Sequence, residues 1–377
     1  MEFLTSSAGS ILSALPPFLL VLTIVVFFHE LGHYLVGRWC GIKAEVFSVG
    51  FGPELFGRTD RHGTHWRVSL IPLGGYVKFL GDENAASMPS GAGEAVLSDA
   101  DRARSFPNAA LWRRAATVAA GPIANFILAI AIFAVFFALN GRMISDPVVA
   151  AVQPGSAAEA AGILPGDRFV AIDGVKVELF DDVQRYVSVR PEQPITVTMD
   201  RDGAMVDLTL TPVRTEISDG FGNKMEVGRI GVITNDEAGN SRLREYGPLE
   251  AVGEGAAQSW YIVTRTFGYI GNIISGREKP DQLGGPIRVA KYSKDMSTVG
   301  LSALIRLAAV LSVSIGLLNL MPVPMLDGGH LVFYAIEAVR GRPPGEAAQE
   351  WAYRVGLSIV LALMIFATWN DVTMLIG

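Results

Sequence analysis

Two histidines and a glutamate lie within one of the most apolar stretches of the chain, VVFFHELGHYLV at residues 25–36. On a helix, His29 and His33 are four residues apart and project from one face, so both imidazoles can bind one metal ion. Glu30 lies on the same turn and can reach a water molecule at the metal without being a ligand. This is the H-E-x-x-H arrangement of zinc hydrolases, in which the glutamate is the general base.

A third protein ligand is still needed, because two histidines and a water leave a zinc site one ligand short. The candidate is Asp327 in NLMPVPMLDGGH, residues 319–330, where Pro322 and Pro324 break the preceding apolar helix. Broken helices at membrane depth are tolerated where they line a cavity. The alternative is that Asp327 is a solvated loop carboxylate ahead of two glycines.

The remaining histidines and the cysteine carry weaker signals. His62 and His65 lie in a loop without further ligands, so we predict surface histidines, and His330 is left without a role. The single cysteine, Cys40, has no partner for an internal disulfide and lies at the end of an apolar segment. We interpret it as a small buried residue.

The composition predicts a polytopic α-helical membrane protein. Of 377 residues, 50% are hydrophobic and only 18% are charged. No Lys/Arg-rich stripe accompanies the net charge of −6, so a nucleic-acid partner is not expected. Four segments are long and apolar enough to cross a lipid bilayer: 15–36, 115–139, 304–321 and 355–369. The first has no Lys or Arg ahead of it and no cleavage pattern after it, so we predict that it is retained.

Charge asymmetry predicts the orientation. The segment from Arg38 to Arg114 carries ten Lys and Arg residues, whereas the N-terminal tail and the C-terminal NDVTMLIG carry none. By the positive-inside rule both termini face outward, and the long region 140–300 lies outside as well. The first span then enters from outside, which places His29 and His33 in its cytosolic half.

A soluble domain is predicted between spans two and three. Residues 148–214 form short alternating strands with turn signals, including a hairpin that turns at 201–203. The run GSAAEAAGILPGDRFVAIDG resembles a PDZ domain, in which a groove between a strand and a helix captures an extended peptide. The alternative is a generic small β domain. We find one copy of this domain.

Three further segments complete the predicted organisation. HWRVSLIPLGGYVKF at 65–79 is predicted to be a hairpin that turns at Gly74 and Gly75, and 84–105 a mobile cytosolic loop. The apolar segment 259–276 suits an interfacial helix, or a helix packed on the PDZ-like domain. The predicted divisions are 1–38, 39–114, 115–139, 140–215, 216–300, 301–340 and 341–377.

Several motifs in order resemble one known family. HELGH, GFG at 50–52, IPLGGYVKF at 71–79, AGPIANF at 120–126 and NLMPVPMLDGGH are similar to the bacterial site-2 protease family, in its regulator of sigma-E protease branch. The resemblance implies an intramembrane zinc (Zn2+) metalloprotease in which His29, His33 and Asp327 hold the metal and Glu30 activates water. One departure is the single PDZ-like domain, where the best-known member has two in tandem.

The resemblance also implies a substrate and a place of action. The 65–79 region would dip into the bilayer beside the site, and its open strand edge would bind an unwound substrate. Asn319, Asn125, Gly74 and Gly75 are the predicted substrate-binding residues, although the two amides could simply bond neighbouring helices. The implied substrate is a single-pass protein of the bacterial inner membrane, an anti-sigma factor that an upstream site-1-type protease has trimmed.

Two other functions remain open from the sequence. One is a catalytically silent membrane scaffold that uses the PDZ-like domain, and the intact Glu30 argues against it. The other is a protease of the same family that acts on signal-peptide remnants or pheromone precursors.

Overall fold

The chain divides into two compact units in a computed structural model that describes residues 2–81, 98–218, 224–234, 241–276, 280 and 284–376. Unit 1 comprises Met1–Phe133, Gly255–Val263 and Leu283–Gly377. Unit 2 comprises Ala134–Glu254 and Thr264–Gln282. Most of the predicted mobile loop at 84–105 lies outside the described residues.

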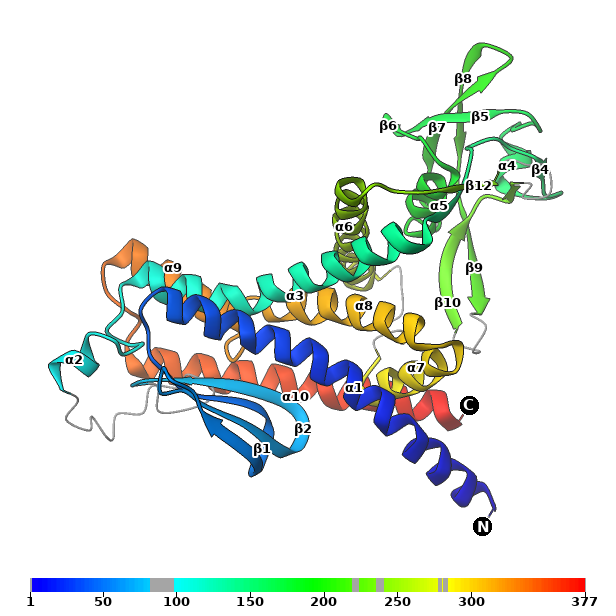
Figure 1. The fold of residues 1–377 in the computed structure, drawn as a ribbon. Coiled ribbons are helices and arrows are strands. Elements are labelled where there is room, and N and C mark those ends of the chain that lie inside the picture. The colour runs from blue at the N-terminus through cyan, green and yellow to red at the C-terminus, as the bar shows by residue number, and fades with distance from the viewer. Residues whose placement is uncertain are drawn as a thin grey trace. The chain divides into compact units, whose positions relative to one another are not determined.

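Long apolar helices dominate unit 1 (Figure 1). Its helices are α1 (Glu2–Trp39), α2 (Asp99–Arg102), α3 (Leu111–Asn140), α7 (Pro286–Val299), α8 (Leu301–Asn319), α9 (Asp327–Arg340) and α10 (Glu346–Ile376), of which α3 continues into unit 2. Within the described residues, four segments are long and apolar enough to span a membrane: Ser13–Trp39, Leu111–Asn140, Leu301–Asn319 and Glu346–Thr373. They coincide with the four predicted spans, so this part of the fold prediction is confirmed.

A glycine allows α1 and α3 to approach closely. A Cβ atom added at Gly32 would lie 2.3 Å from the backbone oxygen of Ala120 and 2.7 Å from the Cβ of Ala124. Small residues at such positions let the backbones of apolar helices come together. The glycine of HELGH therefore faces the AGPIANF segment of α3.

The first sheet is formed by β1 (Ala44–Thr59) and β2 (His65–Phe79), and each strand is sharply bent. As a result, Phe47 has partners on both sides, Val77 and Trp66. The chain reverses at residues 60–64, between the strands, and again between residues 69 and 75, where β2 passes from one side of residues 46–49 to the other. A turn near Gly74 is therefore present as predicted, but its two arms flank β1 and do not pair with each other as a hairpin would. Gly74 lies at this turn with a φ of 149°, where the ring of Phe51 leaves no space for a side chain.

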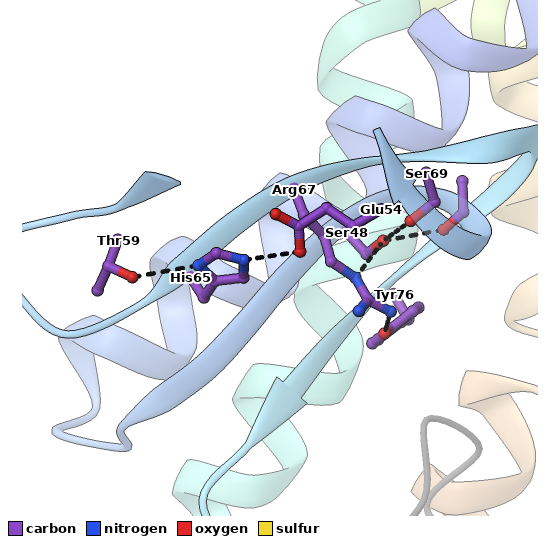
Figure 2. Close-up of polar contacts among 8 residues, drawn as sticks. Ser48, Glu54, Thr59, His65, Arg67, Ser69 and Tyr76 are labelled. Carbon is purple, nitrogen blue, oxygen red and sulfur yellow. Dashed lines mark hydrogen bonds and ion pairs between the residues drawn. The ribbon is translucent and has the colours of Figure 1, made fainter. Parts of the chain in front are cut away.

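The two faces of this sheet differ in polarity. On one face Phe47 stacks on Trp66 with ring centroids 4.2 Å apart, and both pack against Tyr34 of α1. On the other face polar side chains gather around Arg67, whose guanidinium donates to the hydroxyls of Ser48 and Tyr76 (Figure 2). One face thus forms the core against α1, and the other carries a polar network.

Asp60 ties the turn of this sheet to α1. Its Oδ2 accepts hydrogen bonds from the Tyr34 hydroxyl and from Nε1 of Trp66, both at 3.1 Å. Its Oδ1 accepts from the backbone N–H groups of His62 at 2.8 Å and Thr64 at 3.0 Å. Burial alone would raise the pKa of Asp60, but these four bonds lower it from 3.8 to about 2.

Replacing Asp60 by Asn should lower stability in a pH-dependent way. The pKa in the folded protein lies below that of the unfolded chain, so the stabilisation is complete above about pH 4 and is lost as the pH falls toward 2. At neutral pH we expect the variant to lose about 1.5–3 kcal/mol, typical for hydrogen bonds to a charged group. Unfolding in detergent at neutral and at acid pH measures the loss of stability and its dependence on pH. A difference from wild type that does not shrink in acid would contradict this assignment.

A carboxylate of the last span caps α7. Asp371 of α10 is 1% exposed, and it accepts hydrogen bonds from the backbone N–H groups of Gly285 at 2.9 Å and Arg288 at 3.0 Å. The Arg288 side chain lies 3.5 Å from the same carboxylate. These are N–H groups that a helix start leaves without partners, so α10 satisfies the first turn of α7. The helix α7 packs in turn against α1 and α8.

Unit 2 is built around a four-stranded antiparallel sheet in the order β6-β5-β7-β8. The strands are β5 (Arg168–Ile172), β6 (Val175–Lys176), β7 (Ile195–Arg201) and β8 (Ala204–Leu210), with the short helices α4 (Ala157–Ala160) and α5 (Phe180–Ser188). The hairpin predicted at 201–203 is present, since β7 and β8 pair directly. A bidentate pair between Arg201 and the buried Asp167 braces the sheet, and the hydrogen bonds from Arg201 lower the pKa of Asp167.

The compact unit extends beyond the predicted boundary at residue 215. Its other strands are β4 (Ala151–Val152), β9 (Val213–Ser218), β10 (Lys224–Arg229) and β11 (Val232–Ile233). β11 pairs with β4, and Ile230 belongs to the same hydrophobic core as Phe169. This pairing joins segments about eighty residues apart in the chain, so the sequence carries no local signal for it.

One more strand pair closes unit 2. β3 (Arg142–Ser145) follows α3 and pairs antiparallel with β12 (Ser241–Arg244), which leads into α6 (Pro248–Ile274). Ser145 lies directly opposite Ser241 in this register. The chain therefore enters the segment 146–240 and returns from it at adjacent positions, Ser145 and Ser241.

Candidate metal centre

Three predicted ligands converge in unit 1. Nε2 of His29 lies 3.2 Å from Nε2 of His33 and 3.2 Å from Oδ2 of Asp327, and the third separation, from His33 to Asp327, is 3.6 Å. All three side chains are largely buried, with exposed fractions of 11%, 12% and 18%. Within the described residues this is the one group of three or more His, Cys, Asp or Glu side chains that could hold a metal ion.

The spacing of these atoms fits zinc. Ligands about 2.0–2.1 Å from a tetrahedral zinc ion lie about 3.3–3.4 Å from one another, close to the three separations observed. Oδ2 of Asp327 is also buried without a hydrogen-bond donor among the described residues. A buried carboxylate oxygen in that position is costly unless a cation binds it. The residues present therefore fit a zinc ion with two imidazoles and one carboxylate.

The helix start of α9 positions Asp327. Residues 320–326 interrupt the chain between α8 and α9, and Asp327 is the first residue of α9, where the helix dipole favours a carboxylate. The next two residues must be glycine, because a Cβ at Gly328 would lie 2.3 Å from the backbone oxygen of Leu320 and one at Gly329 2.4 Å from that of Val323. Asp327 is thus held by a tight fold of the chain and is not a solvated loop carboxylate.

The helix α3 supports the two histidines from behind. Nδ1 of His33 lies 2.9 Å from the backbone oxygen of Thr117, and Nδ1 of His29 lies 3.2 Å from Nδ2 of Asn125. Gly121 leaves room for the His33 ring, because a Cβ there would lie 2.2 Å from Nε2 of His33. Such contacts behind a ligand histidine fix the ring orientation and the protonated nitrogen.

The same helix also fixes α9. Arg114, in the first turns of α3, pairs with Glu337 of α9 at 2.6 Å and lies over the ring of Tyr334 at 5.1 Å from its centroid. Both partners of the ion pair are mostly buried, with 17% exposed. The helix α3 therefore holds all three candidate ligands in place. It contacts His29 and His33 directly, and it holds Asp327 through the ion pair with α9.

A cavity of about 350 Å³ adjoins the ligands. Glu30 points into this cavity, and its carboxylate interacts with the backbone of Val77 in β2. Two of the predicted substrate-binding groups, Asn319 and the pair Gly74 and Gly75, line the same cavity. Their role in binding substrate stays a prediction.

The structure places the other candidates as follows. Asn125 is fully buried behind His29, and its predicted substrate contact stays untested. His65 is 37% exposed and pairs with Glu54 at 2.9 Å on the sheet (Figure 2), with no third ligand. His330 lines the cavity and packs against Tyr353.

The supporting residues were missed from the sequence. Thr117 acts through its backbone oxygen, which any residue supplies, so its type carries no signal. Gly121 belongs to AGPIANF, a motif that is visible in the sequence but has no evident partner until α3 is known to face α1. Arg114 and Glu337 are separated by more than two hundred residues, and an isolated charge at either position predicts no contact.

The sequence is similar to those of known proteins. The model of Peptidase family M50 matches residues 17–363. A chain of Agrobacterium fabrum that bears a zinc metalloprotease name is 60% identical over 377 residues, covering 100% of both chains. One of Rhizobium meliloti with the same kind of name is 62% identical over 363 residues, covering 96% of this chain and 97% of the relative. Metalloprotease MmpA of Caulobacter vibrioides is 38% identical over 375 residues, covering 94% of each.

A zinc triad with an adjacent glutamate, carried by helices long and apolar enough to cross a membrane, defines a membrane-integral zinc metalloprotease. The chain belongs to peptidase family M50. The resemblance to the site-2 protease family is thereby confirmed, and with it the enzyme class and the zinc cofactor.

Proposed function

We propose that this protease cleaves the transmembrane segments of single-pass proteins within the bilayer. The observation that carries the proposal is the position of the ligands His29 and His33, inside the candidate span Ser13–Trp39. A peptide bond that reaches them must come from a segment at membrane depth. Such a segment has to be locally unwound, because helical amides are hydrogen-bonded and shielded.

The charge distribution supports a site in the cytosolic half of the inner membrane. His29 and His33 lie in the second half of their span, and that half ends near Arg38. The helix α3 starts beside Arg113 and Arg114. By the positive-inside rule these ends face the cytosol, so both termini and unit 2 belong to the periplasmic side.

The edge of β2 is the proposed binding surface for the unwound substrate. Among the described residues, 75–79 pair with β1 along one edge, and four of them line the cavity. A Cβ at Gly75 would lie 3.0 Å from the Val26 side chain, which puts this edge at the level of the metal ligands in α1. An extended substrate could add to this edge by backbone hydrogen bonds. Large apolar side chains near the bends are exposed, as suits a sheet that enters lipid: Phe51, Leu55, Phe56, Leu70, Ile71 and Leu73.

Each residue of the centre then has a chemical task. His29, His33 and Asp327 would hold zinc, which as a Lewis acid polarises the scissile carbonyl and makes water more acidic. Glu30 takes a proton from the attacking water and delivers it to the leaving amine. The helices around the cavity keep bulk solvent away from the substrate segment.

Mapping the cleavage position tests the proposal. The enzyme would be placed in proteoliposomes with a single-pass substrate, and the products identified by mass spectrometry. We expect the cut inside the apolar segment, and we expect helix-breaking Pro or Gly substitutions beside it to accelerate cleavage. Cleavage confined to the polar flanks of the segment would overturn the proposal.

Unit 2 is proposed to be a PDZ-like size filter for substrates. It does not supply any of the metal ligands, and its bulk would collide with a large folded ectodomain. A substrate with a short outer tail, such as an anti-sigma factor already cut by another protease, would pass. The groove lined by Val183 and Val187 of α5 and by β11 could in addition hold a chain end.

Excising most of unit 2 should relax the selection for trimmed substrates. Because Ser145 and Ser241 are paired neighbours, residues 146–240 can be replaced by an Asn-Gly turn without stretching the chain. We expect the zinc-loaded deletion variant to cut a substrate with its full ectodomain nearly as fast as a truncated one. The wild type should strongly prefer the truncated form. If the folded variant keeps the wild-type preference, the filter lies elsewhere.

A further inference from the structure

The amide of Asn125 lies beside the metal centre with an incomplete set of hydrogen bonds. The residue is fully buried in α3, and Nδ2 lies 3.2 Å from Nδ1 of His29. Oδ1 is buried as well, and no described residue donates a hydrogen bond to it. Buried polar atoms rarely lack a partner, so this oxygen calls for an explanation.

The two ligand histidines face different kinds of group. Nδ1 of His33 faces the backbone oxygen of Thr117, which can only accept. His33 is therefore restricted to the tautomer with its proton on Nδ1 and its lone pair on Nε2. Nδ1 of His29 faces an amide, which has a donor end and an acceptor end, so Asn125 can pair with either tautomer.

We propose that Asn125 is a positioning residue that selects the metal-binding tautomer of His29. The converging ligand atom of His29 is Nε2, so binding needs a lone pair there and a proton on Nδ1. With Oδ1 turned toward that N–H, the buried oxygen gains its donor and the ring is fixed. With Nδ2 turned toward Nδ1 instead, the proton lies on Nε2 and His29 cannot bind a metal. This role does not depend on the proposed substrate.

Packing against α8 holds the backbone of Asn125 in place, so only the orientation of its side-chain amide can change. Ser312 donates a hydrogen bond from its hydroxyl to the backbone oxygen of Asn125 at 2.9 Å. A Cβ at Gly316 would lie 3.2 Å from the Cβ of Asn125. Ser312 is therefore a matched control, because its loss removes a buried hydrogen bond from the same helix contact without touching His29.

Three variants of the full-length protein test the role: Asn125→Leu, Asn125→Asp and Ser312→Ala. Zinc affinity is measured by competition with a chelator, and folding by thermal unfolding. We expect Asn125→Leu to bind zinc about 10–100-fold more weakly, as is typical when the hydrogen-bond partner of a ligand histidine is lost. Asn125→Asp keeps an acceptor of the same size and should retain the affinity, as should Ser312→Ala.

The NMR chemical shifts of the imidazole nitrogens report the tautomer of each histidine. The chain has only five histidines, so their signals can be assigned. In zinc-loaded wild type and in Asn125→Asp, His29 should carry its proton on Nδ1. The proposal is overturned if that nitrogen is unprotonated, if Asn125→Leu keeps the wild-type affinity, or if Ser312→Ala loses as much affinity. Should Asn125→Leu fail to fold, Asn125→Asp decides, because a loss of zinc affinity in this variant also overturns the proposal.

Discussion

Replacing Glu30 by Gln is expected to stop proteolysis while zinc stays bound. The three ligands His29, His33 and Asp327 are unchanged, and an amide of the same shape fills the space beside Val77. Glutamine cannot accept the proton of the attacking water, and loss of a general base costs about 10²–10⁴-fold in rate. The measurements are the cleavage rate of a single-pass substrate in proteoliposomes and the zinc content of the purified protein.

A ligand variant provides the contrast. Asp327→Ala should lose zinc and activity together, because only two histidines remain to hold the metal. If Glu30→Gln cleaved at the wild-type rate, the base would have to be another group in the cavity. If it lost zinc as Asp327→Ala does, Glu30 would belong to the ligand set.

Replacing Gly121 by Ala should disable the metal centre through a single methyl group. The added Cβ would lie 2.2 Å from Nε2 of His33 and 2.5 Å from Cε1, well inside contact distance. The ring cannot turn away without breaking its bond to the oxygen of Thr117. We expect zinc affinity to fall by about 100-fold, at the upper end of what disturbing a ligand's surroundings does. Chelator competition measures the loss.

The matched control is another glycine-to-alanine change within a helix. Gly253 of α6 has nothing within 4 Å of an added Cβ, so Gly253→Ala should leave zinc affinity unchanged. Wild-type zinc affinity in Gly121→Ala would show that His33 has another position from which to bind the metal.

The convergence of the three candidate metal ligands could be predicted because local rules place them. The spacing of His29 and His33 places both rings on one helix face, wherever that helix lies. The four spans follow from apolar length alone. Predicting Asp327 required one further inference, that the helix breaks between the prolines and the glycines at the level of the first-span motif. This break is also visible in the local sequence.

The surroundings of the site could not be predicted, because they depend on which helices meet. Nothing in the sequence says that Gly121 faces His33. The sheet shows a second limit. The sequence indicates a turn near Gly74, but nothing in it says that the two arms of β2 flank residues 46–49 and do not pair with each other. The reversal at 60–64 likewise depends on contacts beyond the turn, because Asp60 accepts hydrogen bonds from Tyr34 and Trp66 as well as from the local backbone.

The buried Asp371 sets an order of assembly. It lies in the last span, and the N–H groups that it satisfies, at Gly285 and Arg288, are made more than eighty residues earlier. During synthesis the first turn of α7 therefore has no cap until α10 has entered the membrane. Because α7 packs on α1, the cap that α10 supplies also supports a helix that covers the span with the two histidines. A nascent chain that lacks its last span would be an incomplete protease.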